Sequence, residues 1–213
     1  MLKFIDFLKK RTKSELPGLN SHLKMAPKRF QRSFRNLAPS DNAKESAVLI
    51  LLCEVDNMIH VVLTLRSETL NKHGGQISFP GGRIEVDESP VDAALRETNE
   101  EIGIDVNDIE IICKISDLYV PPSNSLIHPF VGKLKCMPKF DINADEVEEC
   151  FVFPIDYFVD ESNLRAKSEI LEGYEVELPY WDVKSKNVLW GATSMILAEL
   201  LDLYREYLNE SGN

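Results

Sequence analysis

The chain has 213 residues, of which 44% are hydrophobic and 28% are charged, and its net charge is -11. This composition is ordinary for a globular protein and leaves enough apolar side chains for a sizeable core. No apolar run approaches the roughly 20 residues that cross a bilayer, and the acidic balance argues against a general nucleic-acid binder.

The N-terminal segment is basic, unlike the rest of the chain. Residues 1–35 hold ten Lys or Arg against two acidic residues, a net charge of about +8, and subtraction from the total of -11 leaves about -19 for the remainder. We therefore expect residues 1–40 to form a basic helical extension packed on an acidic body that comprises residues 41–213. The alternative is a cleavable transit peptide, because the first 13 residues are amphipathic and poor in acid. The segment lacks the features of a secretory signal, so we expect a cytoplasmic location.

Strands begin after the polar linker 38–46. Two apolar runs, 47–55 and 59–65, are separated by the turn residues Asp56 and Asn57 and predict a hairpin. The remaining segments share either alternating or helical periodicity: strands at 75–79, 109–115, 126–134, 150–155 and 175–181, and helices at 90–102 and 192–208. Strands that alternate with helices in this way favour an α/β domain with a mixed sheet and helices packed on it.

The helix over 90–102 has clear end signals. Ser89 suits the N-cap, Pro90 the first helical position and Gly103 the C-terminal stop. At 100° per residue the apolar residues form one stripe and the glutamates lie on another flank, so we expect separate buried and acidic faces. The apolar stripe comprises Val91, Ala94, Leu95, Thr98 and Ile102, and the acidic flank comprises Glu97, Glu100 and Glu101.

The acidic flank has two interpretations. A solvated face with an ordinary Arg96–Glu100 pair explains it without any function. The second interpretation rests on the stretch "FPGGRIEVDE" just before the helix, where paired glycines allow close backbone approach and Glu88 adds another carboxylate. Mg²⁺ takes oxygen ligands and bridges carboxylates to phosphates, so this pattern predicts metal-assisted hydrolysis with a spare carboxylate as the base.

The segment from Gly82 to Ile104 resembles the Nudix box, Gly-x5-Glu-x7-Arg-Glu-U-x-Glu-Glu-x-Gly-U, where U is a bulky aliphatic residue. Thr98 is the only departure from it. The resemblance implies a Nudix-type α/β/α sandwich and a hydrolase that cleaves a diphosphate with Mg²⁺ or Mn²⁺. It also implies roles for Glu97 and Glu101 as metal ligands, Glu100 as a ligand or the base, Arg96 as a positioning group, and the backbone of Gly81 or Gly82 as a further ligand.

Glu146 is similar in position to a second acidic residue that Nudix proteins bring to the metal. Its neighbours Asp145, Glu148 and Glu149 are equally acidic, and a solvated loop explains all four. Glu146 is therefore a candidate catalytic residue on the resemblance alone.

The stretch "VLTLRSETLNKHGGQISFPGG" is similar to the signature of the coenzyme A pyrophosphatase branch of this family. Asn71 stands where that signature has arginine, which removes a cation that could grip a phosphate. The resemblance implies hydrolysis of coenzyme A or a derivative to 3',5'-ADP and 4'-phosphopantetheine. The candidate substrate-binding residues are Arg66, Ser67, Lys72, His73 and Phe79.

Two other readings of the function stay open. One is a pyrophosphatase acting on ADP-ribose or another nucleoside diphosphate derivative, and the other is a non-catalytic Nudix module that binds a nucleotide or a partner. The expected partner is a small-molecule substrate, with neither nucleic acid nor membrane, and a homodimer is left open.

The stretches "LPGLNSHLKMAPKRF" and "VLWGATSMILAELL" also look like the coenzyme A branch. For Trp190 and Thr193 we expect core packing and an N-cap rather than substrate contact, since aromatic and apolar stripes usually form core.

Overall fold

The computed structural model covers residues 1–213 and describes all of them except 70–72, 138, 172, 185–186 and 213. Among the described residues, no helix is long and apolar enough to cross a membrane. The cytoplasmic location stays a prediction.

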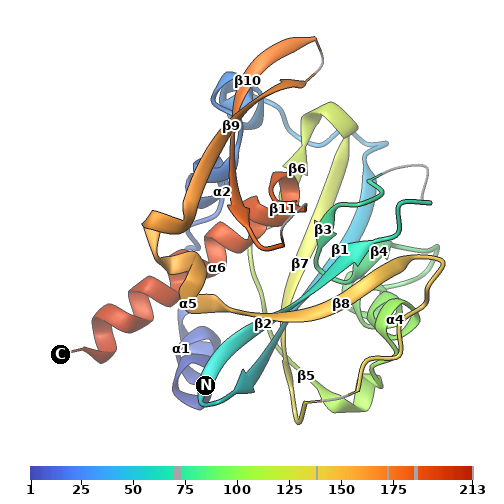
Figure 1. Cartoon of the computed structure of the whole chain (residues 1–213), viewed down its shortest axis with the longest axis vertical. Coiled ribbons are helices and arrows are strands. Elements are labelled where there is room, and N and C mark those ends of the chain that lie inside the picture. The colour runs from blue at the N-terminus through green and yellow to red at the C-terminus, as the bar shows by residue number, and fades with distance from the viewer. Residues whose placement is uncertain (70–72, 138, 172, 185–186, 213) are drawn as a thin grey trace.

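A mixed sheet forms the centre of the molecule (Figure 1). Its main path runs β3-β2-β1-β7-β5, while β4 pairs with β1, β6 with β7 and β8 with β2. The pairing of β1 with β7 is parallel and the other pairings are antiparallel. The strands are β1 (Lys44–Val55), β2 (Met58–Arg66), β3 (Ile77–Ser78), β4 (Gly81–Arg83), β5 (Ile109–Lys114), β6 (Leu118–Val120), β7 (Ser125–Leu134) and β8 (Val147–Pro154).

The predicted hairpin is confirmed as β1 and β2. Asp56 and Asn57 both have positive φ, 50° and 63°, which is the conformation of a two-residue turn whose twist matches that of the strands. Val55 therefore pairs directly with Met58 across the turn.

Helices cover both faces of this sheet, because side chains alternate along β1. Leu49 and Leu51 point to the face covered by α4 (Pro90–Ile102), whereas Ile50 and Leu52 point to the other face. The helices on that other face are α1 (Leu2–Arg11), α2 (Leu19–Met25), α5 (Ile155–Val159) and α6 (Gly191–Ser211). The predicted α/β/α sandwich with N-terminal helices is confirmed.

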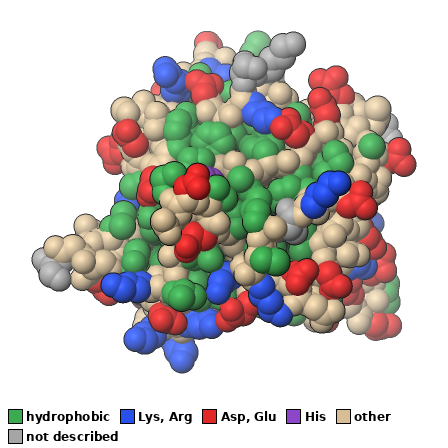
Figure 2. Space-filling model, turned by 60° about the horizontal axis from the view of Figure 1, so that its bottom comes forward, with side chains coloured by type: hydrophobic (Ala, Val, Ile, Leu, Met, Phe, Trp, Pro, Cys, Tyr) green, Lys and Arg blue, Asp and Glu red, His purple; other side chains and the backbone are tan. Residues whose placement is uncertain are grey.

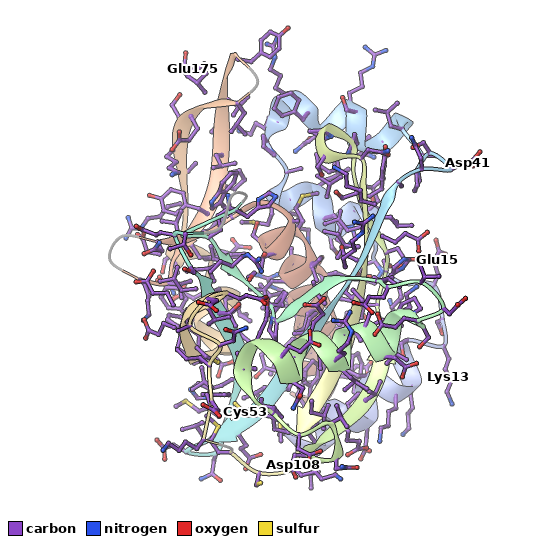
Figure 3. All side chains as sticks on the ribbon, turned by 90° about the vertical axis from the view of Figure 1, so that its right-hand side faces the viewer. Lys13, Glu15, Asp41, Cys53, Asp108 and Glu175 are labelled. Atoms are coloured by element: carbon purple, nitrogen blue, oxygen red, sulfur yellow. The ribbon has the colours of Figure 1, made fainter. Side chains whose placement is uncertain are left out.

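A smaller sheet extends from this sandwich. It comprises β9 (Leu164–Leu171), β10 (Tyr174–Asp182) and β11 (Val188–Leu189), in the order β11-β10-β9. In Figure 3, which is turned to face α4, Glu175 marks the outer end of the β9–β10 hairpin and Asp41 marks the segment before β1. Short helical segments complete the chain: α3 (Gln31–Asn36), η1 (Lys28–Phe30), η2 (Val106–Asp108), η3 (Pro121–Ser123) and η4 (Glu161–Asn163).

The N-terminal helix α1 packs on the body as predicted. Phe4, Ile5 and Leu8 are buried, and the ring of Phe4 lies 4.9 Å from that of Tyr204 in α6. Leu2, an apolar residue of the same helix, is instead 66% exposed. The reason is geometric, because residues 4, 5 and 8 follow the i, i+1, i+4 spacing of one helix face and residue 2 lies outside it.

The basic residues of this segment find acidic partners on the body. The ion pairs are Lys9–Glu110 at 2.7 Å, Arg11–Glu206 at 2.6 Å, Lys24–Asp202 at 2.7 Å and Lys28–Glu177 at 3.1 Å. On the face drawn in Figure 2, basic side chains stand close to acidic ones around a central area of hydrophobic side chains. Four of the ten Lys and Arg side chains of residues 1–35 therefore pair with acidic residues of the body.

A buried polar contact fastens α2 to α6. His22 Nε2 lies 3.1 Å from Glu199 Oε2, and both side chains are almost fully buried. Burial raises the pKa of Glu199, but hydrogen bonds from His22, Ser116 and Gly18 outweigh burial and hold the pKa below its usual value. The N-terminal segment is thus anchored inside the fold and not only by surface pairs.

Candidate active site

The helix α4 places the acidic residues at a fixed distance from the glycine strand β4. Ser89 Oγ accepts a hydrogen bond from the backbone N–H of Asp92, Pro90 is the first helical residue, and Gly103 ends the helix in the left-handed conformation. These local signals explain why the predicted bounds of 90–102 are confirmed. Helix α4 packs against β4 and β1.

Gly81 and Gly82 allow β4 to lie very close to both β1 and α4. Gly81 has a φ of +148°, and a Cβ there would lie 2.3 Å from the carbonyl oxygen of Ala47. A Cβ on Gly82 would lie 2.4 Å from the carboxylate of Glu97. Any side chain at either position would displace β1 or Glu97.

Three carboxylates meet beside these glycines. Ligand oxygens of Glu97, Glu101 and Glu146 all lie within 4.8 Å of one another. We call Glu97, Glu101 and Glu146 the carboxylate cluster. Glu146 comes from the loop before β8, which is tied to the end of α4 by the backbone hydrogen bond from Asn143 N–H to the carbonyl of Glu101.

Glu101 is the most buried member, with a side chain only 1% exposed. Its two oxygens accept hydrogen bonds from Arg66 Nη1 at 3.1 Å and from the Gly81 N–H at 3.2 Å. Burial raises the pKa of Glu101 to about 7, although Arg66 and the Gly81 N–H oppose the rise. The pKa of Glu97 is also raised by burial, against the effect of Arg96.

The expected separation of buried and acidic faces is wrong for Glu101. Ala94, Thr98 and Glu101 follow i, i+4, i+7 spacing and share the buried face of α4. The ion pair with Arg66 and the backbone donor at Gly81 offset the cost of burying this carboxylate.

Arg96 organises the other glutamates of the helix. Its guanidinium donates to both oxygens of Glu88, at 2.8 and 3.0 Å, to Glu97 at 3.0 Å and to Glu100 at 2.9 Å. These partners, Glu88 first, raise the pKa of Arg96, and Arg96 lowers the pKa of Glu88. The bidentate geometry fixes the guanidinium, which in turn holds Glu97 toward the cluster.

Glu100 lies apart from the cluster. Its side chain is 51% exposed and is engaged by Arg96, so the structure does not bring it to the other three carboxylates. The structure instead brings Glu146, the other candidate from the sequence, to Glu97 and Glu101. The role of the Gly81 backbone as a ligand stays a prediction, since the contact shown is its N–H to Glu101.

The predicted substrate-binding residues do not form one surface. Arg66 borders a cavity as well as contacting Glu101, and His73 also lines that cavity. Ser67 is 7% exposed with its hydroxyl bonded to Thr69, and Phe79 is 2% exposed in the core. Phe79 is an apolar side chain that points to the packed face of the sheet, so it offers no surface for substrate. Lys72, like Asn71, lies outside the described residues.

The cavity has a volume of about 520 Å³ and lies between the N-terminal segment, the β6–β7 region, the small sheet and the start of α6. Phe30 and Phe34 line it, and sequence reasoning missed both because nothing local distinguishes them from core residues. Trp190 and Thr193 line it as well, so the expectation of pure core packing is wrong for these two. Thr193 is not the N-cap, because α6 already begins at Gly191.

The carboxylate cluster fits a hard divalent cation. It supplies only oxygen donors, and one of them is buried beside two others at a distance where an ion would relieve their repulsion. Two basic groups beside it, Arg66 and Arg96, pair with Glu101 and Glu97 and offset part of the negative charge.

Comparison with known proteins agrees with this arrangement. The NUDIX domain family matches residues 43–174. Nudix hydrolase 3 of Caenorhabditis elegans is 35% identical over 186 residues, which cover 79% of this chain and 77% of that protein. The mitochondrial coenzyme A diphosphatase NUDT8 of Homo sapiens is 30% identical over 163 residues, which cover 74% of this chain and 68% of that protein.

A solved structure shows the same fold. The Nudix hydrolase RenU from M. smegmatis aligns with a TM-score of 0.52 at 14% identity, over 79% of this chain and 87% of that one. The family match over residues 43–174 and the 35% identical relative show that the chain belongs to the Nudix hydrolase family.

Proposed function

We propose that this chain hydrolyses the diphosphate linkage of coenzyme A or a coenzyme A derivative, with Mg²⁺ or Mn²⁺ as the cofactor. The observation that carries the proposal is the carboxylate cluster beside Gly81 and Gly82, since it combines oxygen ligands with close backbone approach. The choice of coenzyme A is supported by the stretch before the Nudix box and by the similarity to a coenzyme A diphosphatase.

Glu97 and Glu101 would hold the metal ion, with Glu146 beside it as the third member of the carboxylate cluster. When bound, such an ion neutralises phosphate oxygens and makes a bound water more acidic. Members of this family generally use divalent ions such as Mg²⁺ or Mn²⁺. Arg96 keeps Glu97 oriented, and Arg66 keeps Glu101 oriented while remaining close to the place where a phosphate would enter.

The proton of the attacking water needs an acceptor. Glu97 and Glu101 are each engaged by an arginine, whereas among the described residues no Lys or Arg pairs with Glu146. We therefore assign the base to Glu146 in place of Glu100, which is half exposed and held by Arg96. The water oxygen forms a new P–O bond, the bridging P–O bond breaks, and the two products are 3',5'-ADP and 4'-phosphopantetheine.

A product assay tests the proposal. The pure protein with Mg²⁺ or Mn²⁺ is incubated with coenzyme A, its thioesters, ADP-ribose and dinucleoside polyphosphates, and the products are identified by mass. We expect 3',5'-ADP from coenzyme A and from its thioesters, and no product in the presence of EDTA.

Matched variants separate the metal site from general damage. Glu97→Gln should lower turnover at least about a hundredfold, since it removes a charged ligand. Glu161→Gln, in η4 and outside the cluster, should leave turnover unchanged. Cleavage of ADP-ribose but not of coenzyme A would reject coenzyme A as the substrate. If none of the tested compounds is cleaved, the proposal that the protein is an enzyme is rejected.

A further inference from the structure

One residue, Arg66, connects the cavity with the carboxylate cluster. Arg66 ends β2, lines the cavity, and places its guanidinium 3.1 Å from Glu101. A ligand whose diphosphate reached the cluster would therefore extend past Arg66 into the cavity. Ligand sites of about 300 to 1,000 Å³ are typical, and about 520 Å³ falls within that range.

The chemistry of the walls limits what can enter. Most of the lining is apolar, with aromatic or aliphatic groups from separate elements such as Phe34, Ile127, Leu178 and Trp190. Among the described residues that line it, Arg66 is the one Lys or Arg, and it already pairs with Glu101. Among the described lining residues, a second phosphate would therefore find no Lys or Arg without a carboxylate partner, and burying an unpaired phosphate is costly.

We propose that this cavity binds the uncharged, largely apolar part of an organic diphosphate, with the phosphate-bearing nucleoside directed away from it. The inference rests on the proposed function. For a coenzyme A thioester, the acyl end would enter the cavity and the 3'-phosphate would stay outside.

The N-terminal segment supplies one wall of the cavity. Phe30 and Phe34 belong to η1 and α3, and both precede the part of the chain, 43–174, that matches the family. Neighbouring contacts hold this wall against the small sheet: the Arg29 guanidinium lies 4.0 Å from the centre of the Tyr174 ring, and Lys28 pairs with Glu177 at 3.1 Å. Part of the wall that meets the apolar group would thus come from residues outside the family match.

A binding experiment on the full chain tests this without relying on turnover. The probes are ethyl and octyl methylenediphosphonate, in which a CH₂ group replaces the bridging oxygen so that the enzyme cannot cleave them. Dissociation constants are measured by calorimetry with Mg²⁺. Each methylene group that enters an apolar site strengthens binding by roughly fourfold. Burial of only two methylene groups of the octyl chain would therefore make the dissociation constant of the ethyl compound more than about tenfold larger than that of the octyl compound.

Three variants make the result specific. Phe34→Ala removes part of the wall, and Ala192→Trp fills the cavity from the first turn of α6. Phe7→Ala is the matched control, because it removes a half-buried phenylalanine of the same N-terminal segment that packs on Tyr207 instead. Thermal melts of all three establish that they fold.

We expect the octyl compound to bind wild type and Phe7→Ala at least about tenfold more tightly than the ethyl compound, and both cavity variants to bring this ratio close to one. Equal binding of the two compounds by wild type would overturn the proposal. A ratio that both cavity variants leave unchanged would overturn it as well. Failure to hydrolyse coenzyme A would reject the proposed function. The ratio of the two dissociation constants would still test whether the cavity binds the apolar group.

Discussion

Replacing Glu101 by glutamine should make the metal-free protein less sensitive to pH. The wild-type carboxylate is 1% exposed, and burial raises its pKa from 4.5 to about 7. The folded state therefore binds more protons than the unfolded state between these two values, and its stability falls as the pH rises through this window. Glutamine does not titrate, so the variant lacks this loss.

The size of the effect follows from the same pKa. Since one pKa unit corresponds to about 1.4 kcal/mol, ionised Glu101 costs the folded state about 3 kcal/mol at pH 8 and less than about 1 kcal/mol at pH 5. Glutamine has one acceptor oxygen for the two donors, Arg66 and the Gly81 N–H, so the variant also loses about 1–3 kcal/mol at every pH. That second loss moves the whole curve without changing its slope.

The assay is urea unfolding of wild type and Glu101→Gln in EDTA from pH 5 to pH 8. We expect the free energy of unfolding of the variant, relative to wild type, to rise by about 2–3 kcal/mol across this range. Glu100→Gln is the control, because the same substitution one residue earlier changes a half-exposed side chain. Parallel curves for wild type and Glu101→Gln would refute the reasoning.

Three further predictions concern other contacts. Phe4→Ala should lower the free energy of unfolding by about 3–5 kcal/mol and Leu2→Ala by less than about 0.5 kcal/mol, because Phe4 is fully buried and Leu2 is 66% exposed; urea unfolding of both tests the packing of α1. Gly82→Ala should weaken Mg²⁺ binding at least about tenfold in calorimetry, since its Cβ would lie 2.4 Å from the Glu97 carboxylate, and unchanged affinity would contradict the close approach. The pKa of Glu199 is lowered, so its contribution to stability is present above the usual glutamate value and is lost as the pH falls through the lowered one; Glu199→Gln should therefore flatten the acid side of the stability curve.

Local chemistry was sufficient for several parts of this protein. Ser89, Pro90 and Gly103 act within one helical turn of the ends of α4, so its bounds were predictable from neighbours in the sequence. The turn at Asp56 and Asn57 likewise depends on residues that are adjacent along the chain. The spacing of Glu97 and Glu101 put both on α4 and made a metal site a reasonable hypothesis.

Tertiary structure decided which of these residues meet. Helical spacing places Glu101 on a flank, but only the approach of β2 and β4, with Arg66 and the Gly81 N–H, makes its burial affordable. Glu146 reaches the cluster because its loop is bonded to the end of α4, a contact between segments some 40 residues apart along the chain. The cavity exists because Phe34 and Trp190, from opposite ends of the sequence, line one space, and an apolar side chain gives no local signal of whether it will face a core or a ligand.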